Sequence, residues 1–163
     1  MTTQPGVASG ADELGKAYDP GATERGWYEF WHSRGYFKPV DRGRGPYVVI
    51  MPPPNVTGEL HMGHALFSAV EDLMIRYHRM LGFAALWLPG ADHAGIAGQW
   101  VVEKELAKEG LTRHDLGREQ FLSRVWDWME SYQERIKGQL QSLGASCDWS
   151  RYVFTMDPGP AHA

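Results

Sequence analysis

Two short, continuously apolar segments constrain the fold of this 163-residue chain most strongly. Residues 47–51 read YVVIM and residues 83–88 read FAALWL, and a loop with proline and glycine follows each of them. Apolar runs of this length are typical of strands that are covered on both faces. Each loop leads into a helical pattern, over residues 61–81 and 99–109. The repeated order of strand, loop and helix predicts an α/β fold with two parallel strands joined by a helix.

The helical patterns have recognisable ends and apolar faces. In the first pattern, apolar side chains recur at helical spacing, and Gly82 is suited to end the helix. These side chains are Ala65, Val70, Leu73, Met74, Tyr77 and Leu81. Further along, Thr112 and Asp115 fit a capping box. Beyond this box, apolar residues over 121–143 step by three or four and predict one long amphipathic helix.

In parallel sheets of this kind, ligands bind beyond the carboxyl ends of the strands. Residues 52–60, PPPNVTGEL, and residues 89–98, PGADHAGIAG, occupy those positions. A proline run also occurs in stiff linkers, but here it ends a strand without needing hydrogen-bond partners and stiffens a loop. Stiffness lowers the ordering cost when a ligand binds. Asn55 and Thr57 add polar groups and Gly58 adds backbone freedom, so the two loops are the predicted walls of a site.

His61 and His64 lie three residues apart at the start of the first predicted helix, and therefore on the same side of it. Their rings and the helix N-terminus together offer donors for phosphate oxygens, because a neutral imidazole keeps one N–H. Gly63 removes side-chain bulk, so that a flat or bulky group can approach the backbone there. Two other interpretations stay open: a metal-binding pair, for which no third ligand is obvious, and surface histidines without a role.

Asp92 follows the second apolar segment and its Pro-Gly turn. Its carboxylate is suited to capping the next helix, and equally to holding an ammonium group at the end of the strand. The residue pattern by itself does not choose between these two roles.

Composition excludes several classes of protein. The net charge is −4, whereas a domain that binds nucleic acid by itself is usually basic. Cys147 is the single cysteine, so neither an intrachain disulfide nor a cysteine zinc cluster can form. No apolar run approaches the roughly 18 residues of a membrane span, and the N-terminal residues lack a secretory signal pattern. We therefore expect a cytoplasmic protein with no membrane partner and no structural metal.

The string PPPNVTGELHMGHAL, residues 52–66, contains His-x-Gly-His and resembles the first signature of the class I aminoacyl-tRNA synthetases. IRYHRM, LWLPGADHAGIA, VVEKEL, TRHDLGRE, LGASCDW and FTMD follow in the order typical of the valyl members, and the similarity covers residues 18–157. The isoleucyl members are the nearest alternative. The resemblance implies the first half of a class I synthetase Rossmann-like nucleotide-binding fold, a parallel βαβ unit with long helices.

The resemblance also implies a reaction, in which valine and ATP give valyl-adenylate and pyrophosphate, and valine then passes to tRNA(Val). ATP with Mg²⁺, valine and tRNA(Val) are the implied partners. On the nucleotide side, His61 and His64 would be catalytic and would contact the ATP phosphates. Gly63 would let adenine and ribose lie against the helix start, and Thr57 and Gly58 would also bind ATP.

On the amino-acid side, the resemblance implies that Asn55 and Asp92 hold the valine ammonium group. Pro53 and Pro54 would line the pocket that receives the valine side chain. This assignment favours the ammonium role of Asp92 over the capping role.

Several parts of the family's enzymes have no counterpart here: the Lys-Met-Ser-Lys-Ser loop, the editing domain and the anticodon-binding domain. The resemblance therefore implies the N-terminal half of the catalytic domain over residues 18–157. Residues 1–17 are rich in Gly, Ala and Thr and are expected to be a disordered leader, and residues 158–163, which do not resemble the family, are expected to be a tail. A truncated paralogue that binds ATP or an adenylate without aminoacylation, and a non-functional fragment, are the alternatives. Without the C-terminal half of the synthetase, an open strand edge, an uncovered apolar face and self-association are expected.

Overall fold

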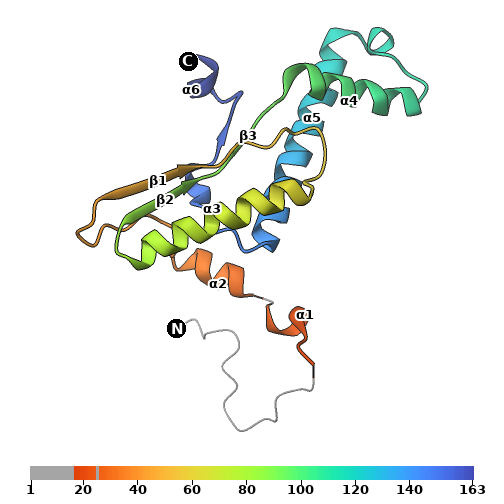
Figure 1. Ribbon diagram of the computed structural model, residues 1–163. Helices are drawn as coiled ribbons and strands as arrows, with labels where there is room; N and C mark the ends of the chain where they lie inside the picture. The colour runs from red at the N-terminus through yellow and green to blue at the C-terminus, as the bar shows by residue number, and fades with distance from the viewer. Residues whose placement is uncertain (1–16, 25) are drawn as a thin grey trace.

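The computed structural model describes residues 17–24 and 26–163 (Figure 1). Its helices are α1 (Pro20–Thr23), α2 (Trp27–Ser33), α3 (Met62–Met80), α4 (Gly95–Lys108), α5 (Arg113–Ser142) and α6 (Pro158–Ala161). Its strands are β1 (Pro46–Ile50), β2 (Ala84–Leu88), β3 (Gly90–Ala91) and β4 (Val153–Phe154), with a 3-10 turn, η1 (Trp149–Arg151), before β4. The predicted leader lies outside the described residues, apart from residue 17.

The predicted βαβ unit is confirmed. β1 and β2 form a parallel pair in which Pro46 lies opposite Ala84 and Ile50 opposite Leu88. α3 connects the two strands and contacts both of them, as a crossover helix does (Figure 1). Gly82 follows the helix with a φ of 94°, the left-handed conformation that commonly ends helices.

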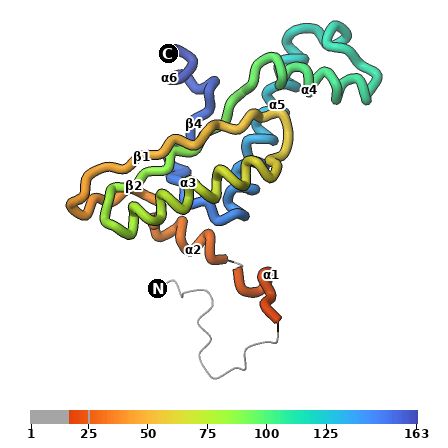
Figure 2. The backbone as a smooth tube through the Cα atoms, viewed as in Figure 1, coloured from red at the N-terminus to blue at the C-terminus, as the bar shows by residue number. Residues whose placement is uncertain are grey.

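A second, shorter parallel pair joins the segment after β2 to the segment after η1. β3 pairs with β4, so that Gly90 lies opposite Val153 (Figure 2). Glycine is required here, because a Cβ on residue 90 would lie 2.6 Å from the carbonyl oxygen of Val153. The backbone N–H of Thr155 donates to the carbonyl of Ala91 at 3.2 Å and extends the pairing. Residues 153–155 are thereby held beside the loop that follows β2.

The β1–β2 pair is buried on one face only. Trp87 of β2 belongs to a core cluster with Ile75 of α3 and Ile136 of α5. On β1, by contrast, the side chains of Val48 and Ile50 are 53% and 68% exposed. The prediction that this strand is covered on both faces is therefore wrong for the described chain. The expected uncovered apolar face is confirmed.

The apolar row of α3 points away from the core. Met62, Leu66, Leu73 and Met80 are between 69% and 83% exposed, and most of the apolar residues that predict the helix are exposed as well. Ser68 and Ile75, from the other side of the helix, are its buried residues. An amphipathic helix normally buries its apolar stripe, whereas the apolar stripe of α3 is exposed.

The buried side of α3 is held by polar contacts to the segment after α5. Asp72 accepts a hydrogen bond from the backbone N–H of Ser146 at 3.0 Å. Arg76 donates to the carbonyl of Gly144 at 2.7 Å, and Arg79 donates to the hydroxyl of Ser146 at 3.1 Å. Because these contacts are polar, the hydrophobic pattern of α3 gives no sign of which side packs.

α5 begins with the predicted capping box. The hydroxyl of Thr112 accepts from the backbone N–H of Asp115, and the Asp115 carboxylate accepts from the backbone N–H of Thr112 at 2.8 Å. Gly117, with a φ of 73°, interrupts the helical conformation near its start. Although α5 is long, no helix in the described part of the chain combines the length and apolar character that crossing a membrane requires.

Candidate functional site

Residues 52–64, which we call the first corner, comprise the loop after β1 and the first turn of α3. They form most of the wall of a cleft of about 370 Å³. The residues that line it are Pro52, Pro53, Pro54, Asn55, Thr57, Gly58, Glu59, Leu60, His61, His64 and Phe67. Most of the residues that the sequence predicts for the site therefore meet in one cleft, and two of them, Gly63 and Asp92, do not line it.

The two histidines cap the N-terminus of α3 reciprocally. The backbone N–H of Gly63 donates to Nδ1 of His61, and the backbone N–H of His61 donates to Nδ1 of His64, both at 3.1 Å. The ring centroids lie 4.0 Å apart. The expectation that the two rings share one side of the helix is confirmed.

This cap fixes where each ring carries its proton. Both Nδ1 atoms accept hydrogen bonds, so the proton of each neutral ring is on Nε2. Burial of the ring, and then the neighbouring His61, hold the pKa of His64 below its ordinary value, which favours the neutral form. The pair therefore offers two Nε2–H donors beside the positive end of α3.

Gly63 leaves room for the His61 ring of the histidine cap. A Cβ on residue 63 would lie 2.9 Å from Cε1 and 3.0 Å from Nδ1 of His61. Contacts this short would displace the ring and break its hydrogen bond. The predicted role, in which the glycine lets adenine and ribose lie against the helix start, stays a prediction.

α5 holds the first corner in place from the outside. Trp128 donates from Nε1 to the carbonyl of Val56 at 3.0 Å, and the Val56 side chain is fully buried. Gln139 accepts from the backbone N–H of Leu60 at 3.0 Å. Arg135 forms an ion pair with Glu59 at 2.9 Å. These contacts span more than seventy residues of sequence, and no motif signals them.

Residues 89–95, which we call the second corner, connect β2 to α4. Oδ1 of Asp92 accepts hydrogen bonds from the backbone N–H of Ala94 at 3.0 Å and from the hydroxyl of Thr155 at 3.2 Å. The N-cap of α4 is Ala94, with a φ of 48°, and not Asp92. The capping interpretation of Asp92 is therefore wrong, and its carboxylate instead supports the turn before the helix.

The two corners meet through their backbones. Asn55 and Asp92 form an isolated parallel bridge, in which Val56 N–H donates to the Asp92 carbonyl at 3.0 Å and Asp92 N–H to the Pro54 carbonyl at 2.8 Å. Asn55 and Asp92 are thus neighbours at the carboxyl ends of adjacent parallel strands, where ligands bind in such sheets. The Asp92 side chain is 38% exposed and remains accessible.

Thr155 is the polar residue that sequence reasoning missed. Its hydroxyl accepts from the backbone N–H of His93 at 2.9 Å and lies 2.7 Å from Nδ1 of the same residue. The pairing of β4 with β3 brings Thr155 into the second corner. The only signal in the sequence is its place in the string FTMD, which carries no chemistry of its own.

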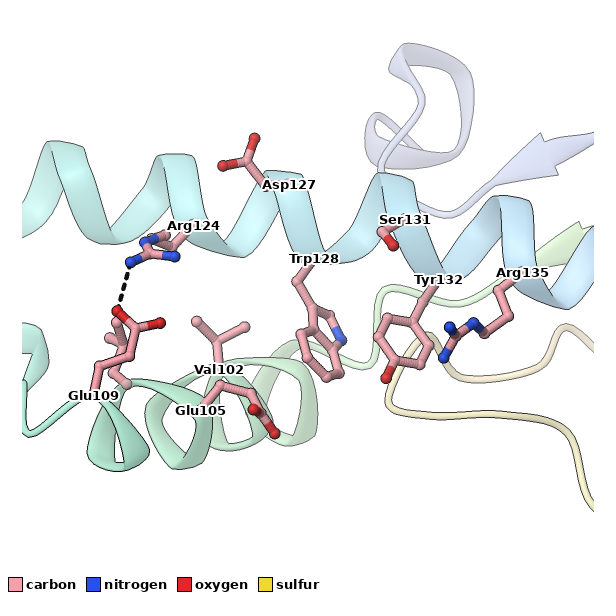
Figure 3. A pocket seen from close by; sticks show the side chains of 10 residues that line it. Val102, Glu105, Glu109, Arg124, Asp127, Trp128, Ser131, Tyr132 and Arg135 are labelled. Carbon is pink, nitrogen blue, oxygen red and sulfur yellow. Dashed lines mark hydrogen bonds and ion pairs between the residues drawn. The ribbon is translucent and has the colours of Figure 1, made fainter.

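A second cleft, of about 360 Å³, lies between α4 and α5 (Figure 3). Arg124 of α5 and Glu109, the residue directly after α4, form an ion pair across it at 2.7 Å. Trp128 and Tyr132 of α5 stack with ring centroids 4.1 Å apart, and Figure 3 shows the Trp128 ring turned toward α4. None of the residues predicted for the site lines this cleft, which forms the packing seam of the two helices.

Metal binding finds little support in these side chains. In residues 17–24 and 26–163, no three His, Cys, Asp or Glu side chains gather as a metal ion requires. In the described residues, therefore, no third ligand joins His61 and His64 to support their interpretation as a metal-binding pair.

Comparison with known proteins agrees with this geometry. Residues 26–163 match the family model described as tRNA synthetases class I (I, L, M and V). The valine–tRNA ligase of Dehalococcoides mccartyi is 60% identical over 156 residues, which are 95% of this chain and 18% of that protein. The valine–tRNA ligase of Thermus thermophilus is 59% identical over 145 residues, which are 89% of this chain and 17% of that protein. The chain thus spans less than a fifth of the length of these curated relatives.

A solved structure shows the same fold at low sequence identity. It is a LeuRS chain of Agrobacterium radiobacter K84 agnB2, from the crystal structure of a ternary complex, LeuRS-tRNA-LeuAMS. The match has a TM-score of 0.68 at 19% identity and covers 88% of this chain and 17% of that chain. The parallel βαβ unit, the histidine pair at the start of its helix and the family match over most of the sequence lead to one conclusion. This chain belongs to the class I tRNA synthetases of the isoleucyl, leucyl, methionyl and valyl group.

Proposed function

We propose that this chain is the part of a valine–tRNA ligase that binds ATP and valine, and that residues 18–157 form the N-terminal half of its nucleotide-binding domain. The family match and the identity of 59–60% to proteins named valine–tRNA ligase support the proposal. The proposed reaction joins valine to ATP and passes the valine to tRNA(Val). The remainder of the synthetase would be the chain's partner in both steps.

The nucleotide side of the proposal rests on the histidine cap. In the activation step, the carboxylate of valine attacks the α-phosphorus of ATP, a bond to the α-phosphate forms, and pyrophosphate leaves. Nε2–H of His61 and of His64 would donate to phosphate oxygens, beside the positive end of α3. Thr57 and Gly58, in the same cleft, would contact the nucleotide. These donors stabilise charge that develops during the attack.

The amino-acid side of the proposal rests on the bridge between the two corners. Asn55 and Asp92 would hold the ammonium group of valine, because the carboxylate supplies charge and the amide supplies an oxygen acceptor. Pro53 and Pro54 would form the apolar wall for the side chain. Fixing both substrates in this way supplies positioning, which accounts for much of the barrier reduction in reactions of this kind.

Mg²⁺ would enter with the triphosphate, and no residue of this chain is assigned to it, because the described part of the chain gathers no metal-ligating cluster. A cytoplasmic location is proposed as well. The single cysteine, Cys147, is buried and free, which suits a reducing compartment.

The observation that carries the proposal is the pair of fixed Nε2–H donors in the cleft beside the Asn55–Asp92 bridge. Exchange of labelled pyrophosphate into ATP tests it, with the chain and the remainder of the synthetase present together and with valine, isoleucine and threonine compared at equal concentrations. We expect exchange that depends on valine and that falls on the order of 100-fold in His64→Ala. His162→Ala, which replaces an exposed histidine in the last turn of the chain, is the matched control.

Other outcomes separate the alternatives. Nucleotide binding without exchange supports a truncated paralogue that holds ATP or an adenylate. Faster exchange with isoleucine than with valine supports an isoleucyl-type synthetase. Absence of both binding and exchange supports a fragment with no activity of its own.

A further inference from the structure

We infer that Thr155 is a positioning residue, whose hydroxyl orients the Asp92 carboxylate toward the ammonium group of the amino-acid substrate. The identity of this ligand rests on the proposed function. The arrangement of hydrogen bonds around Asp92 is independent of it.

The hydrogen bonds around Thr155 have one consistent direction. The hydroxyl has a single hydrogen, and Oδ1 of the ionised Asp92, 3.2 Å away, can only accept it. The hydroxyl oxygen is then free to accept from the backbone N–H of His93 at 2.9 Å and from its ring at 2.7 Å. The ring contact therefore requires the His93 proton on Nδ1, which also lies 3.3 Å from Oδ1 of Asp92.

With this direction of the hydrogen bonds, the two carboxylate oxygens of Asp92 have different roles. Oδ1 receives the backbone N–H of Ala94 and the hydroxyl of Thr155. Within the part of the chain that the structure describes, Oδ2 accepts no hydrogen bond. One oxygen thus fixes the rotation of the carboxylate, and the other remains available for an ammonium group, which forms charge-assisted hydrogen bonds with carboxylates.

Thr155 can act this way only because its backbone is fixed. Its N–H donates to the Ala91 carbonyl at 3.2 Å, directly after the β3–β4 pair. Gly90 permits this close approach. The subsite for the amino group is therefore completed by a segment 63 residues beyond Asp92 in sequence.

Two variants of the full 163-residue chain test the inference. Thr155→Val keeps the shape of the side chain and removes the hydroxyl, whereas Thr155→Ser keeps the hydroxyl. In ¹⁵N-histidine NMR spectra, we expect a proton on Nδ1 of His93 in the wild type and in Thr155→Ser. In Thr155→Val, we expect this preference to be lost while the His61 and His64 signals stay unchanged.

Valine titration followed by NMR then tests the role. We expect Thr155→Val to need about tenfold more valine than the wild type, because a fixed charge-assisted contact is lost. Thr155→Ser should remain within about twofold of the wild type, since it retains that contact. In the exchange assay, the KM for valine should rise by a similar factor while the KM for ATP stays unchanged.

Three results would overturn the inference: equal valine affinity in Thr155→Val and the wild type, equal loss in Thr155→Ser and Thr155→Val, or a matching rise in the KM for ATP. The proposed function fails in a different way. If valine binding depends on the Thr155 hydroxyl but the wild-type chain supports no exchange, the positioning role stands and the proposed activity of this chain does not.

Discussion

In the first corner, His61 and His64 are each held by a backbone N–H no more than three residues away. In the second corner, Asp92 and His93 are held by the hydroxyl of Thr155, more than sixty residues further along the chain. With the hydrogen-bond direction inferred above for Thr155, the histidines of the two corners carry their protons on opposite ring nitrogens, Nε2 in the first and Nδ1 in the second.

This difference shows that a site can be built by two kinds of constraint. A local cap forms whenever α3 forms, because its partners are neighbours in sequence. A contact across sixty residues forms only after β3 and β4 have paired, because that pairing must first bear the entropy cost of closing a long loop. We therefore expect the second corner to be disrupted more easily than the first.

Gly90→Ala is expected to have the largest effect. The added Cβ would meet the Val153 carbonyl oxygen at 2.6 Å and push β4 away from β3, which should lower the free energy of unfolding by about 3 kcal/mol. Urea unfolding measures the loss, and NMR reports the His93 proton position. Gly159→Ala, where nothing lies within 4 Å of the added Cβ, is the matched control. Equal disturbance of His61 and His64 would break the comparison between the corners.

Trp128→Phe is expected to have the next largest effect, on the first corner. The change removes the donor to the buried Val56 carbonyl, so the free energy of unfolding should fall by about 2 kcal/mol. Chemical denaturation of the variant measures it. Trp126→Phe, at a position that is 41% exposed, should stay within about 0.5 kcal/mol of the wild type. Equal losses in the two variants would show that α5 does not hold the first corner through this hydrogen bond.

Gly63→Ala separates stability from site geometry. Displacing the His61 ring removes a cap worth about 1 kcal/mol, but alanine favours the helix by about the same amount. The free energy of unfolding should therefore change by less than about 0.5 kcal/mol. The ¹⁵N signals of His61 should nevertheless lose their preference for a proton on Nε2. A variant that keeps this preference would contradict the cap as the reason for the glycine.

The smallest expected effect is a pH dependence of the first corner. The pKa of His64 is held below its unfolded value of 6.5, first by burial and then by His61. Stability from this group is therefore present in full above pH 6.5 and is lost as the pH falls through the lowered pKa. Urea unfolding at several pH values measures this loss.

His64→Gln supplies the control for this pH dependence. Glutamine can accept the same backbone hydrogen bond without titrating, so the variant should lose less stability on acidification than the wild type. His162→Gln should leave the dependence unchanged. An identical pH profile in His64→Gln and the wild type would show that protonation of His64 does not weaken the cap.

Local patterns in the sequence predicted much of the fold and of the first corner. The strand at residues 47–51 appears as β1 (Pro46–Ile50), shifted by one residue, and Thr112 and Asp115 form their capping box. His61 and His64 lie together as expected from their spacing. The direction of the α3 stripe could not be predicted, because polar bonds from Asp72 and Arg76 decide which side of that helix packs.

The sequence by itself determined the order of strands and helices and the pairing of the two histidines, since both depend on periodicity and on residues within one turn. Only the tertiary structure decided that α5 supports the first corner and that Thr155 completes the second. Such contacts join residues that lie far apart in the sequence, and no periodic pattern of residues relates the two positions. They exist because packed strands and helices bring particular polar atoms within hydrogen-bonding distance.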